Sequence, residues 1–268
     1  MKMTPKTPPS AELAEEPRFH LFDFESCIRG NVREVTVYLP PQYLKEPSRR
    51  FSVFYLQDGQ NLFDGQSSYV ANRTWSAHTT SDALISRGLI EPIILVGVAH
   101  TGLNRVDEYT PTQDQLRGGA GASYGQMLIE ELMPFVDRTY RTSTGPPSAA
   151  LGGSSLGGLI SLYLGLKYPE VFGKLAIMSP ALWWDNCSIL REMEKVEPRP
   201  NLQVWLDIGS EEGPRPVREA DLLYRLMVER GWLPDRDIKF VRVEGGRHDE
   251  AAWGARLAHV LMFLFPNR

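Results

Sequence analysis

Short apolar segments recur along the chain, and the spacing of their hydrophobic residues predicts where strands lie. Val35, Val37 and Leu39 alternate with polar residues, as in a strand with one buried face. Residues 238–243 also alternate, which indicates a strand near the edge of a sheet. Apolar runs without alternation predict strands that are buried on both faces, and these runs cover residues 51–56, 93–98, 148–151, 175–178 and 202–208.

Helical patterns separate most of these strands. Ser81 can cap a helix that Gly88 ends, residues 124–138 carry one apolar face, and a buried helix starts near residue 159. Two more helices are predicted, over residues 217–230 and in a last segment that runs to about residue 265. Because strands and helices alternate, we expect one α/β domain over residues 18–268, with a mostly parallel central sheet and helices on both faces.

Three stretches do not fit this alternation. Residues 1–17 are rich in proline, lysine and glutamate, so we expect a flexible N-terminal tail. Residues 100–123 read as a long polar loop, and loops of this length inside compact domains are often functional. Residues 185–200 form a charged segment that is short for a lid, which predicts an open crevice.

Composition and charge narrow the classes of function. The 268 residues are 42% hydrophobic and 23% charged, as expected for a globular protein with a sizeable core. The net charge of −4 offers no basic field, so we expect neither nucleic acid nor a membrane as a partner. Two cysteines, Cys27 and Cys187, predict free thiols rather than a disulfide framework. Without an apolar signal core we expect a cytoplasmic protein, although a trimmed signal peptide would leave the same sequence.

The glycine-rich segment around Ser155 carries the clearest chemical signal. It joins an apolar strand to a buried helix, which is the setting of a nucleophile elbow. Of its two serines, only Ser155 has glycine two positions before it (Gly153) and two after it (Gly157). A Cβ at either glycine would crowd the sharp turn, and the following helix directs its first N–H groups at a developing oxyanion. The alternative is a glycine-rich turn with two solvated serines.

A serine nucleophile needs a general base, and the base needs a carboxylate that holds its tautomer. In sheets of this kind the three groups follow in the order serine, acid, histidine, each from a loop at the end of a strand. His248 is the one histidine of five that lies in a glycine-rich loop directly after the last strand. Asp207, Glu211 and Glu212 crowd the end of the preceding strand. We predict Glu212 as the acid and leave Glu211 and Asp207 as alternatives.

The loops around this elbow contain the candidates for the oxyanion hole and for the substrate pocket. An oxyanion hole requires two convergent backbone N–H groups, and we expect them from Leu156 and from Gln60 in the loop after the strand 51–56. We expect Arg105, Trp183 and Trp184 to line an acyl or aromatic pocket, with core packing as the alternative for the tryptophans. Clusters with metal-ligand spacing are lacking in the sequence, so we expect neither a metal nor another cofactor.

These residues resemble the Putative esterase family of α/β hydrolases, which includes enterochelin, feruloyl and acetylxylan esterases, esterase D-type enzymes and antigen 85 mycolyltransferases. The resemblance runs from about residue 33 to residue 266. Its most specific block extends from the Ser155 elbow to Trp183 and Trp184 and is most similar to enterochelin esterases, as is the segment from His248 to Trp253. The resemblance implies the α/β-hydrolase fold, Ser155 as nucleophile, His248 as base, a loop acid that matches Glu212, and an oxyanion hole at Gln60.

We therefore expect a serine carboxylic-ester hydrolase that acts on a small-molecule ester through a covalent acyl-enzyme. Two alternatives use the same triad: an acyltransferase to a carbohydrate hydroxyl, and a feruloyl or acetylxylan-type carbohydrate esterase. A non-catalytic binding module is a further alternative, but such modules usually lack the serine or the histidine, and this chain has both. The acyl and alcohol parts of the substrate stay open, as does the choice between monomer and homodimer.

Overall fold

A nine-stranded sheet forms the centre of the computed structural model, which describes residues 2–7, 18–68 and 70–267. Its strands lie in the order β1-β2-β3-β5-β4-β8-β9-β10-β11. The last six in this order are parallel to one another, and β3, β2 and β1 continue the sheet in antiparallel pairs. The strands are β1 (Lys2–Lys6), β2 (Phe19–Ser26), β3 (Asn31–Tyr38), β4 (Ser52–Gln57), β5 (Ile93–Val98), β8 (Ala149–Ser154), β9 (Lys174–Met178), β10 (Gln203–Gly209) and β11 (Ile238–Val243).

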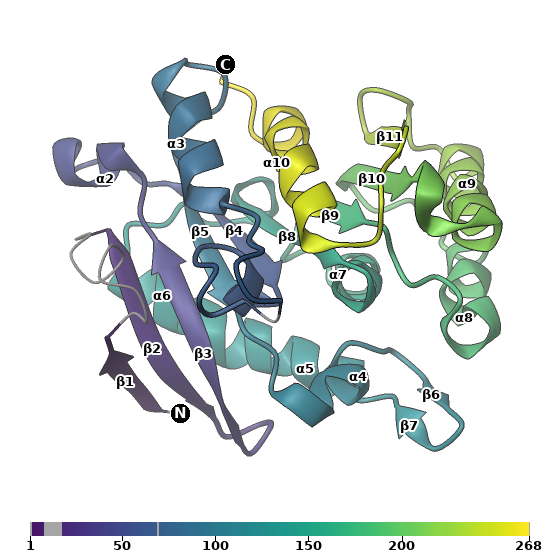
Figure 1. Ribbon diagram of the computed structural model, residues 1–268, viewed down its shortest axis with the longest axis horizontal. Helices are drawn as coiled ribbons and strands as arrows, with labels where there is room; N and C mark the ends of the chain where they lie inside the picture. Colours follow the sequence, from purple (N-terminus) through teal and green to yellow (C-terminus); the bar gives the residue numbers. More distant parts are fainter. Residues whose placement is uncertain (1, 8–17, 69, 268) are drawn as a thin grey trace.

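Helices cover both faces of the sheet (Figure 1). One face carries α3 (Ala77–Ser86) and α10 (Glu250–Leu264), and the other carries the remaining long helices. Within β4, Val53 and Tyr55 enter the larger core while Phe54 and Leu56 enter the smaller one, as the pleat of a strand requires. The helices on the larger core are α5 (Gly121–Gln126), the π-helical turn η3 (Met127–Leu132), α6 (Met133–Thr139), α7 (Leu156–Lys167), α8 (Trp184–Met193) and α9 (Pro214–Glu229).

The structure therefore confirms the mostly parallel sheet with helices on both faces. The apolar runs predicted as buried strands are strands, because a strand covered on both faces has no polar side to alternate with. Within the described ranges, every helix is too short or too polar to span a lipid bilayer.

Several element boundaries differ from the sequence prediction. Helix α3 begins at Ala77, and Ser81 lies buried in its interior rather than at its cap. The charged segment 185–200 contains most of α8, which contributes Ile189, Leu190 and Met193 to the larger core. The pattern of residues 19–26 was not recognised as a strand. The predicted loop 100–123 holds short elements, namely η2 (Gly102–Asn104), α4 (Arg105–Glu108), the β6 (Gln113–Asp114) and β7 (Arg117–Gly118) hairpin, and the start of α5.

The prediction of a flexible tail over residues 1–17 is corrected in its first part. Lys2–Lys6 forms an edge strand that pairs antiparallel with β2. Its Lys6 ammonium group makes ion pairs with Asp23 and Glu34. Low hydrophobicity argued against structure here, but an edge strand is held mainly by backbone hydrogen bonds, which do not depend on the hydrophobicity of its side chains. Residues 8–17 lie outside the described residues.

Candidate active site

Ser155 occupies the sharp turn between β8 and α7. Its backbone has φ 57° and ψ −122°, a strained conformation that points the side chain away from both elements. A Cβ added at Gly153 would lie 2.8 Å from the Cβ of Gln57, and one at Gly157 would lie 3.0 Å from the same atom. The crowding expected from the sequence is therefore present, and its source is the strand β4 that runs beside β8.

His248 lies in the loop between β11 and α10 and bridges the serine and an acid. Its Nε2 is 3.0 Å from Ser155 Oγ, and its Nδ1 is 2.6 Å from Glu212 Oε2. The indole of Trp253 packs edge-on against the imidazole, with ring centroids 4.9 Å apart. Three loops that are distant in sequence thus meet over the carboxyl ends of β8, β10 and β11, as the spacing of the motifs predicted.

Glu212 ends the short helical turn η5 (Ser210–Glu212) that follows β10, and only 2% of its side chain is exposed. Its second oxygen, Oε1, accepts hydrogen bonds from Ser179 Oγ at 2.6 Å and from the backbone N–H of Gly209 at 2.8 Å. Burial by itself would raise the pKa of Glu212, but the hydrogen bonds from His248, Ser179 and Gly209 outweigh it and hold this pKa below its usual value. The carboxylate is therefore ionised at neutral pH and acts as an acceptor.

The two alternative acids have other partners. Glu211 is exposed and makes an ion pair with Arg247 at 2.8 Å. Asp207 is fully buried, where it accepts hydrogen bonds from Arg256 Nη1 at 2.6 Å and from Trp205 Nε1 at 2.8 Å. Burial raises the pKa of Asp207 above its usual value, because it outweighs the effect of the Arg256 charge. Of the three carboxylates, Glu212 is the one that contacts His248.

The loop after β4 approaches the serine from the other side. Asp58 has a left-handed backbone (φ 54°), and a Cβ added at Gly59 would lie 2.5 Å from the carbonyl carbon of Gly97, so only glycine lets the turn pack on β5. Gln60 follows and lines the same cavity as Ser155. Leu156 is the first residue of α7, and N–H groups in the first turn of a helix have no intrahelical acceptor.

A cavity of about 760 Å³ opens over Ser155 and His248. Arg105, predicted as a substrate-binding residue, lies in its wall and donates two hydrogen bonds of 2.7 Å to the Asp58 carboxylate. Arg73, Arg117, His100 and the exposed apolar side chains Val70 and Leu103 also line this cavity. Its wall thus combines apolar surface with cationic groups and with the carboxylates of Asp58, Asp249 and Glu250.

The predicted role of the two tryptophans is not supported by their positions. Trp184 is buried in the larger core and donates a hydrogen bond from Nε1 to the backbone oxygen of Thr112 at 2.9 Å. Trp183 is 44% exposed. Among the described residues that line the Ser155 cavity, neither tryptophan is present. The cause is α8, which starts at Trp184 and turns that side chain toward the core.

Two residues near the acid were not recognised from the sequence. Ser179, at the end of β9, contacts Glu212, and Arg256, on α10, contacts Ser179 and Asp207. The available signal for Arg256 was a charged residue on the buried side of an apolar helix, where an unpaired charge is costly and a partner is required.

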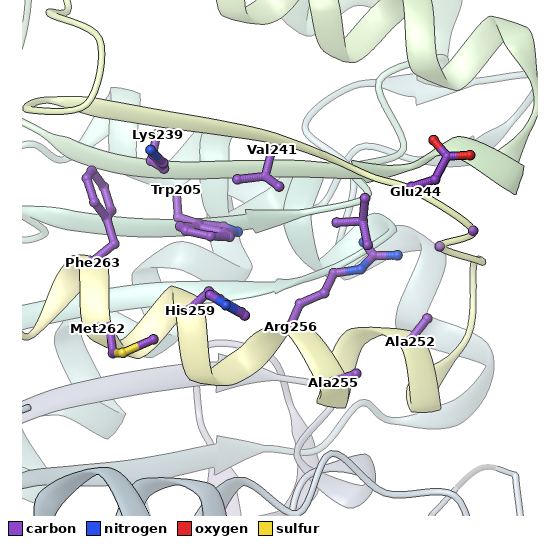
Figure 2. Close-up of a pocket in the computed structure, with 13 residues that line it drawn as sticks. Trp205, Lys239, Val241, Glu244, Ala252, Ala255, Arg256, His259, Met262 and Phe263 are labelled. Atoms are coloured by element: carbon purple, nitrogen blue, oxygen red, sulfur yellow. The ribbon is translucent and has the colours of Figure 1, made fainter. Parts of the chain in front are cut away.

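A second cavity, of about 660 Å³, lies between α10 and the strands β10 and β11 (Figure 2). Its lining is mainly apolar and includes Trp205, Val241 and Met262, while Arg256 extends from α10 toward the strands. Ser155 and His248 are not among its lining residues, so the reactive groups belong to the first cavity.

Comparison with known proteins shows the family. The chain matches the family described as Putative esterase over residues 27–264, and it belongs to that family. The uncharacterized protein YbbA of Bacillus subtilis (strain 168) is 31% identical over 208 residues, which is 75% of each chain. The iron(III) enterobactin esterase of Escherichia coli (strain K12) is 30% identical over 145 residues, or 52% of this chain and 33% of that enzyme. An endo-1,4-beta-xylanase/feruloyl esterase of Xylanibacter ruminicola is 26% identical over 249 residues, or 90% of this chain and 30% of that one.

Solved structures show the same fold. The BES protein from Bacillus cereus aligns with a TM-score of 0.76 at 21% identity and covers 99% of both chains. The enterobactin esterase from Shigella flexneri, solved in the presence of enterobactin, aligns with a TM-score of 0.76 at 21% identity over 97% of this chain and 60% of that one. The α/β-hydrolase fold is confirmed, and family and homologues together confirm the prediction of a serine esterase.

Proposed function

We propose that this esterase hydrolyses carboxylic esters with Ser155 as the nucleophile, His248 as the general base and Glu212 as the orienting acid. The observation that carries the proposal is the pair of contacts made by one imidazole, 3.0 Å from Ser155 Oγ and 2.6 Å from the Glu212 carboxylate. Both distances are within the range that a working triad requires. The His248 side chain is 46% exposed, so water can reach the imidazole, as hydrolysis of the acyl-enzyme requires.

The reaction follows from these contacts. Because the ionised Glu212 accepts a hydrogen bond from Nδ1–H, Nε2 of His248 presents its lone pair to the Ser155 hydroxyl. Ser155 Oγ attacks the ester carbonyl carbon while its proton moves to Nε2, and the N–H groups of Leu156 and Gln60 donate hydrogen bonds to the oxygen on which negative charge develops. His248 then returns the proton to the leaving alcohol. Water, deprotonated by the same imidazole, attacks the acyl-enzyme and releases the acid.

We propose esters of phenolic or catecholic acids as the substrate class. Two relatives are named for enterobactin and feruloyl esters. In this chain Arg73, Arg105 and Arg117 line the cavity together with Leu103 and Val70, and guanidinium groups bind electron-rich aromatic rings while apolar side chains cover their faces. The cavity volume of about 760 Å³ is ample for one such acyl group and part of its alcohol.

A panel of esters tests both parts of the proposal. The panel contains aryl esters from acetate to long chains, methyl ferulate and a catecholate trilactone. We expect Ser155→Ala to lower kcat at least about a thousandfold on every active ester. We expect Arg117→Met, which removes an exposed guanidinium group of the cavity wall, to raise KM for the ferulate and catecholate esters about tenfold and to leave p-nitrophenyl acetate within about threefold. An active Ser155→Ala variant would refute the nucleophile, and an equal effect of Arg117→Met on all esters would refute the substrate class.

We also propose that the protein acts in the cytoplasm. Cys27 and Cys187 form no disulfide with each other, which is consistent with a reducing compartment. Fractionation of cells that carry the untagged chain, with immunodetection in each fraction, tests this location.

A further inference from the structure

Ser179 is the centre of a buried cluster that holds Glu212 from the side opposite His248. We define the Ser179 cluster as Ser179, Asp207, Trp253 and Arg256. The Ser179 hydroxyl lies 2.6 Å from Glu212 Oε1, 3.0 Å from Trp253 Nε1 and 3.0 Å from Arg256 Nη1. All four members are at most 5% exposed.

The chemistry of these partners fixes the direction of every hydrogen bond. An indole N–H and a guanidinium N–H can only donate, so the Ser179 oxygen accepts from both Trp253 and Arg256. A hydroxyl has one proton, and among the described residues the remaining partner of the Ser179 hydroxyl is Glu212, an ionised carboxylate. Ser179 must therefore donate to Glu212 Oε1, and it cannot rotate to serve as an acceptor there.

The direction of these hydrogen bonds determines which nitrogen of His248 carries the proton. Oε1 of Glu212 is occupied by two donors, Ser179 and the Gly209 N–H, so Oε2 is presented to His248. His248 then carries its proton on Nδ1 and leaves Nε2 open toward Ser155. The Gly209 amide together with Ser179, Trp253 and Arg256 thus selects the tautomer that the reaction needs, and of these side chains Ser179 and Arg256 lie outside the lining of the Ser155 cavity.

The cluster also fixes the local charge. Arg256 lies between two carboxylates, with Nη1 at 2.6 Å from Asp207 Oδ1 and Nη2 at 3.5 Å from Glu212 Oε1. One buried cation against two buried carboxylates leaves one negative charge when His248 is neutral. Protonation of His248, which occurs when Ser155 attacks, brings the net charge of Asp207, Glu212, Arg256 and His248 to zero.

We propose that Ser179, Arg256 and Asp207 are positioning residues for the ester hydrolysis, which fix the orientation of Glu212 and keep one uncompensated negative charge beside His248. The proposal rests on the proposed function, because it assigns a role to the partners of Glu212. Other charged groups around His248 lie in the substrate cavity, on its own loop or, for Glu211, in an ion pair with that loop, and these are Asp58, Arg73, His100, Arg105, Arg117, Glu211, Glu244, Arg247, Asp249 and Glu250. They are unchanged in the variants below and serve as a constant background.

The first test removes the hydroxyl in two ways. Ser179 has φ 41°, so Ser179→Ala keeps a strained backbone, whereas Ser179→Gly relaxes it. We expect both variants to lower kcat by about 10- to 100-fold with KM within about twofold, although Ser179→Gly should melt at the higher temperature. Ser188→Ala, which removes a buried hydroxyl that contacts Thr112, is the matched control and should keep full kcat. Activity that follows melting temperature instead of the missing hydroxyl would overturn the proposal.

The second test changes the charge of the cluster. Asp207→Asn removes a negative charge, so protonated His248 is less favoured and the acid limb of the kcat/KM profile should move to lower pH, by up to about one unit. Asp237→Asn is the charge-matched control, because Asp237 precedes β11 at the other end of the strand and pairs with Arg199. An unmoved or upward-shifted limb in Asp207→Asn would overturn the charge role.

The proposed function and the positioning role of the Ser179 cluster can be refuted independently of each other. Loss of activity in Ser155→Ala together with wild-type behaviour of Ser179→Gly and Asp207→Asn would refute the positioning cluster and leave the proposed function standing. Full activity of Ser155→Ala would refute the proposed function itself.

Discussion

Replacement of Glu212 by glutamine is the most incisive single change at this site, because it keeps the size of the side chain and alters one hydrogen-bonding group. Oε1 faces two donors, Ser179 Oγ and the Gly209 N–H, and Oε2 faces His248 Nδ1. The amide oxygen of glutamine will take the Oε1 position, since the NH₂ group there would leave two buried donors without an acceptor. The NH₂ group then points at Nδ1 and stabilises the tautomer with its proton on Nε2, which cannot deprotonate Ser155.

Two free-energy contributions determine the loss of kcat that we expect in Glu212→Gln. Restoring the productive tautomer requires the amide to leave hydrogen bonds unmade, at about 1–3 kcal/mol for each buried group. The carboxylate charge is also lost: two charges about 4 Å apart interact by about 4 kcal/mol at an effective dielectric constant of about 20. Because the His248 side chain is 46% exposed, we reduce this second contribution to about 2 kcal/mol. Together they predict a loss of kcat of at least about a thousandfold.

The assay is steady-state hydrolysis of p-nitrophenyl acetate and methyl ferulate by Glu212→Gln, beside Glu211→Gln as the matched control. Glu211 is exposed and pairs with Arg247, so its variant should keep kcat within about twofold. We expect the melting temperature of both variants to stay within a few degrees of the wild type. Retention of more than a tenth of kcat in Glu212→Gln, or an equal loss in Glu211→Gln, would refute the assignment of the acid and the tautomer argument with it.

Two further predictions concern the scaffold. In Gly209→Ala the new Cβ would lie 2.2 Å from Gly246 O and 2.8 Å from Glu212 Oε1. It should therefore separate the loop that carries Glu212 from the loop that carries His248 and lower kcat more than about tenfold. The control is Gly245→Ala, which has open space around its new Cβ and should lower the free energy of unfolding by only about 1 kcal/mol in an unfolding titration. Burial by itself would raise the pKa of Glu108, but hydrogen bonds from Arg33, Asn31 and Arg29 outweigh burial and hold this pKa below its usual value. The ionised carboxylate therefore stabilises the fold above about pH 4.3, and this contribution is lost as the pH falls through the lowered pKa. Glu108→Gln should therefore lower the free energy of unfolding by about 3 kcal/mol at pH 7, and this difference from the wild type should shrink in acid. Thermal melts that show the same difference between variant and wild type at pH 7 and at pH 3 would contradict this prediction.

Periodicity and turn chemistry were enough to predict the layered architecture. Strands such as Ile93–Val98 can be recognised in the sequence because burial on both faces leaves an unbroken apolar run. The alternation of such strands with helices then predicts a parallel sheet. The same local reading failed for α8 and β1. The apolar stripe of α8 is short and lies among charged residues, and β1 is held by backbone pairing and by ion pairs of Lys6, which hydrophobicity does not record.

The reactive site divides in the same way between sequence and tertiary structure. Ser155 and His248 were recognised by what surrounds each of them in the chain, a glycine-flanked turn after one strand and a glycine-rich loop after another. The sequence predicted Glu212 and left Glu211 and Asp207 as alternatives, because the direction in which each carboxylate points depends on contacts with residues up to 49 positions away. The burial of Trp184 and the cluster around Ser179 were likewise decided by packing. Local sequence fixes backbone conformation and burial pattern, whereas the partners of a side chain are set by how separate elements come together in space.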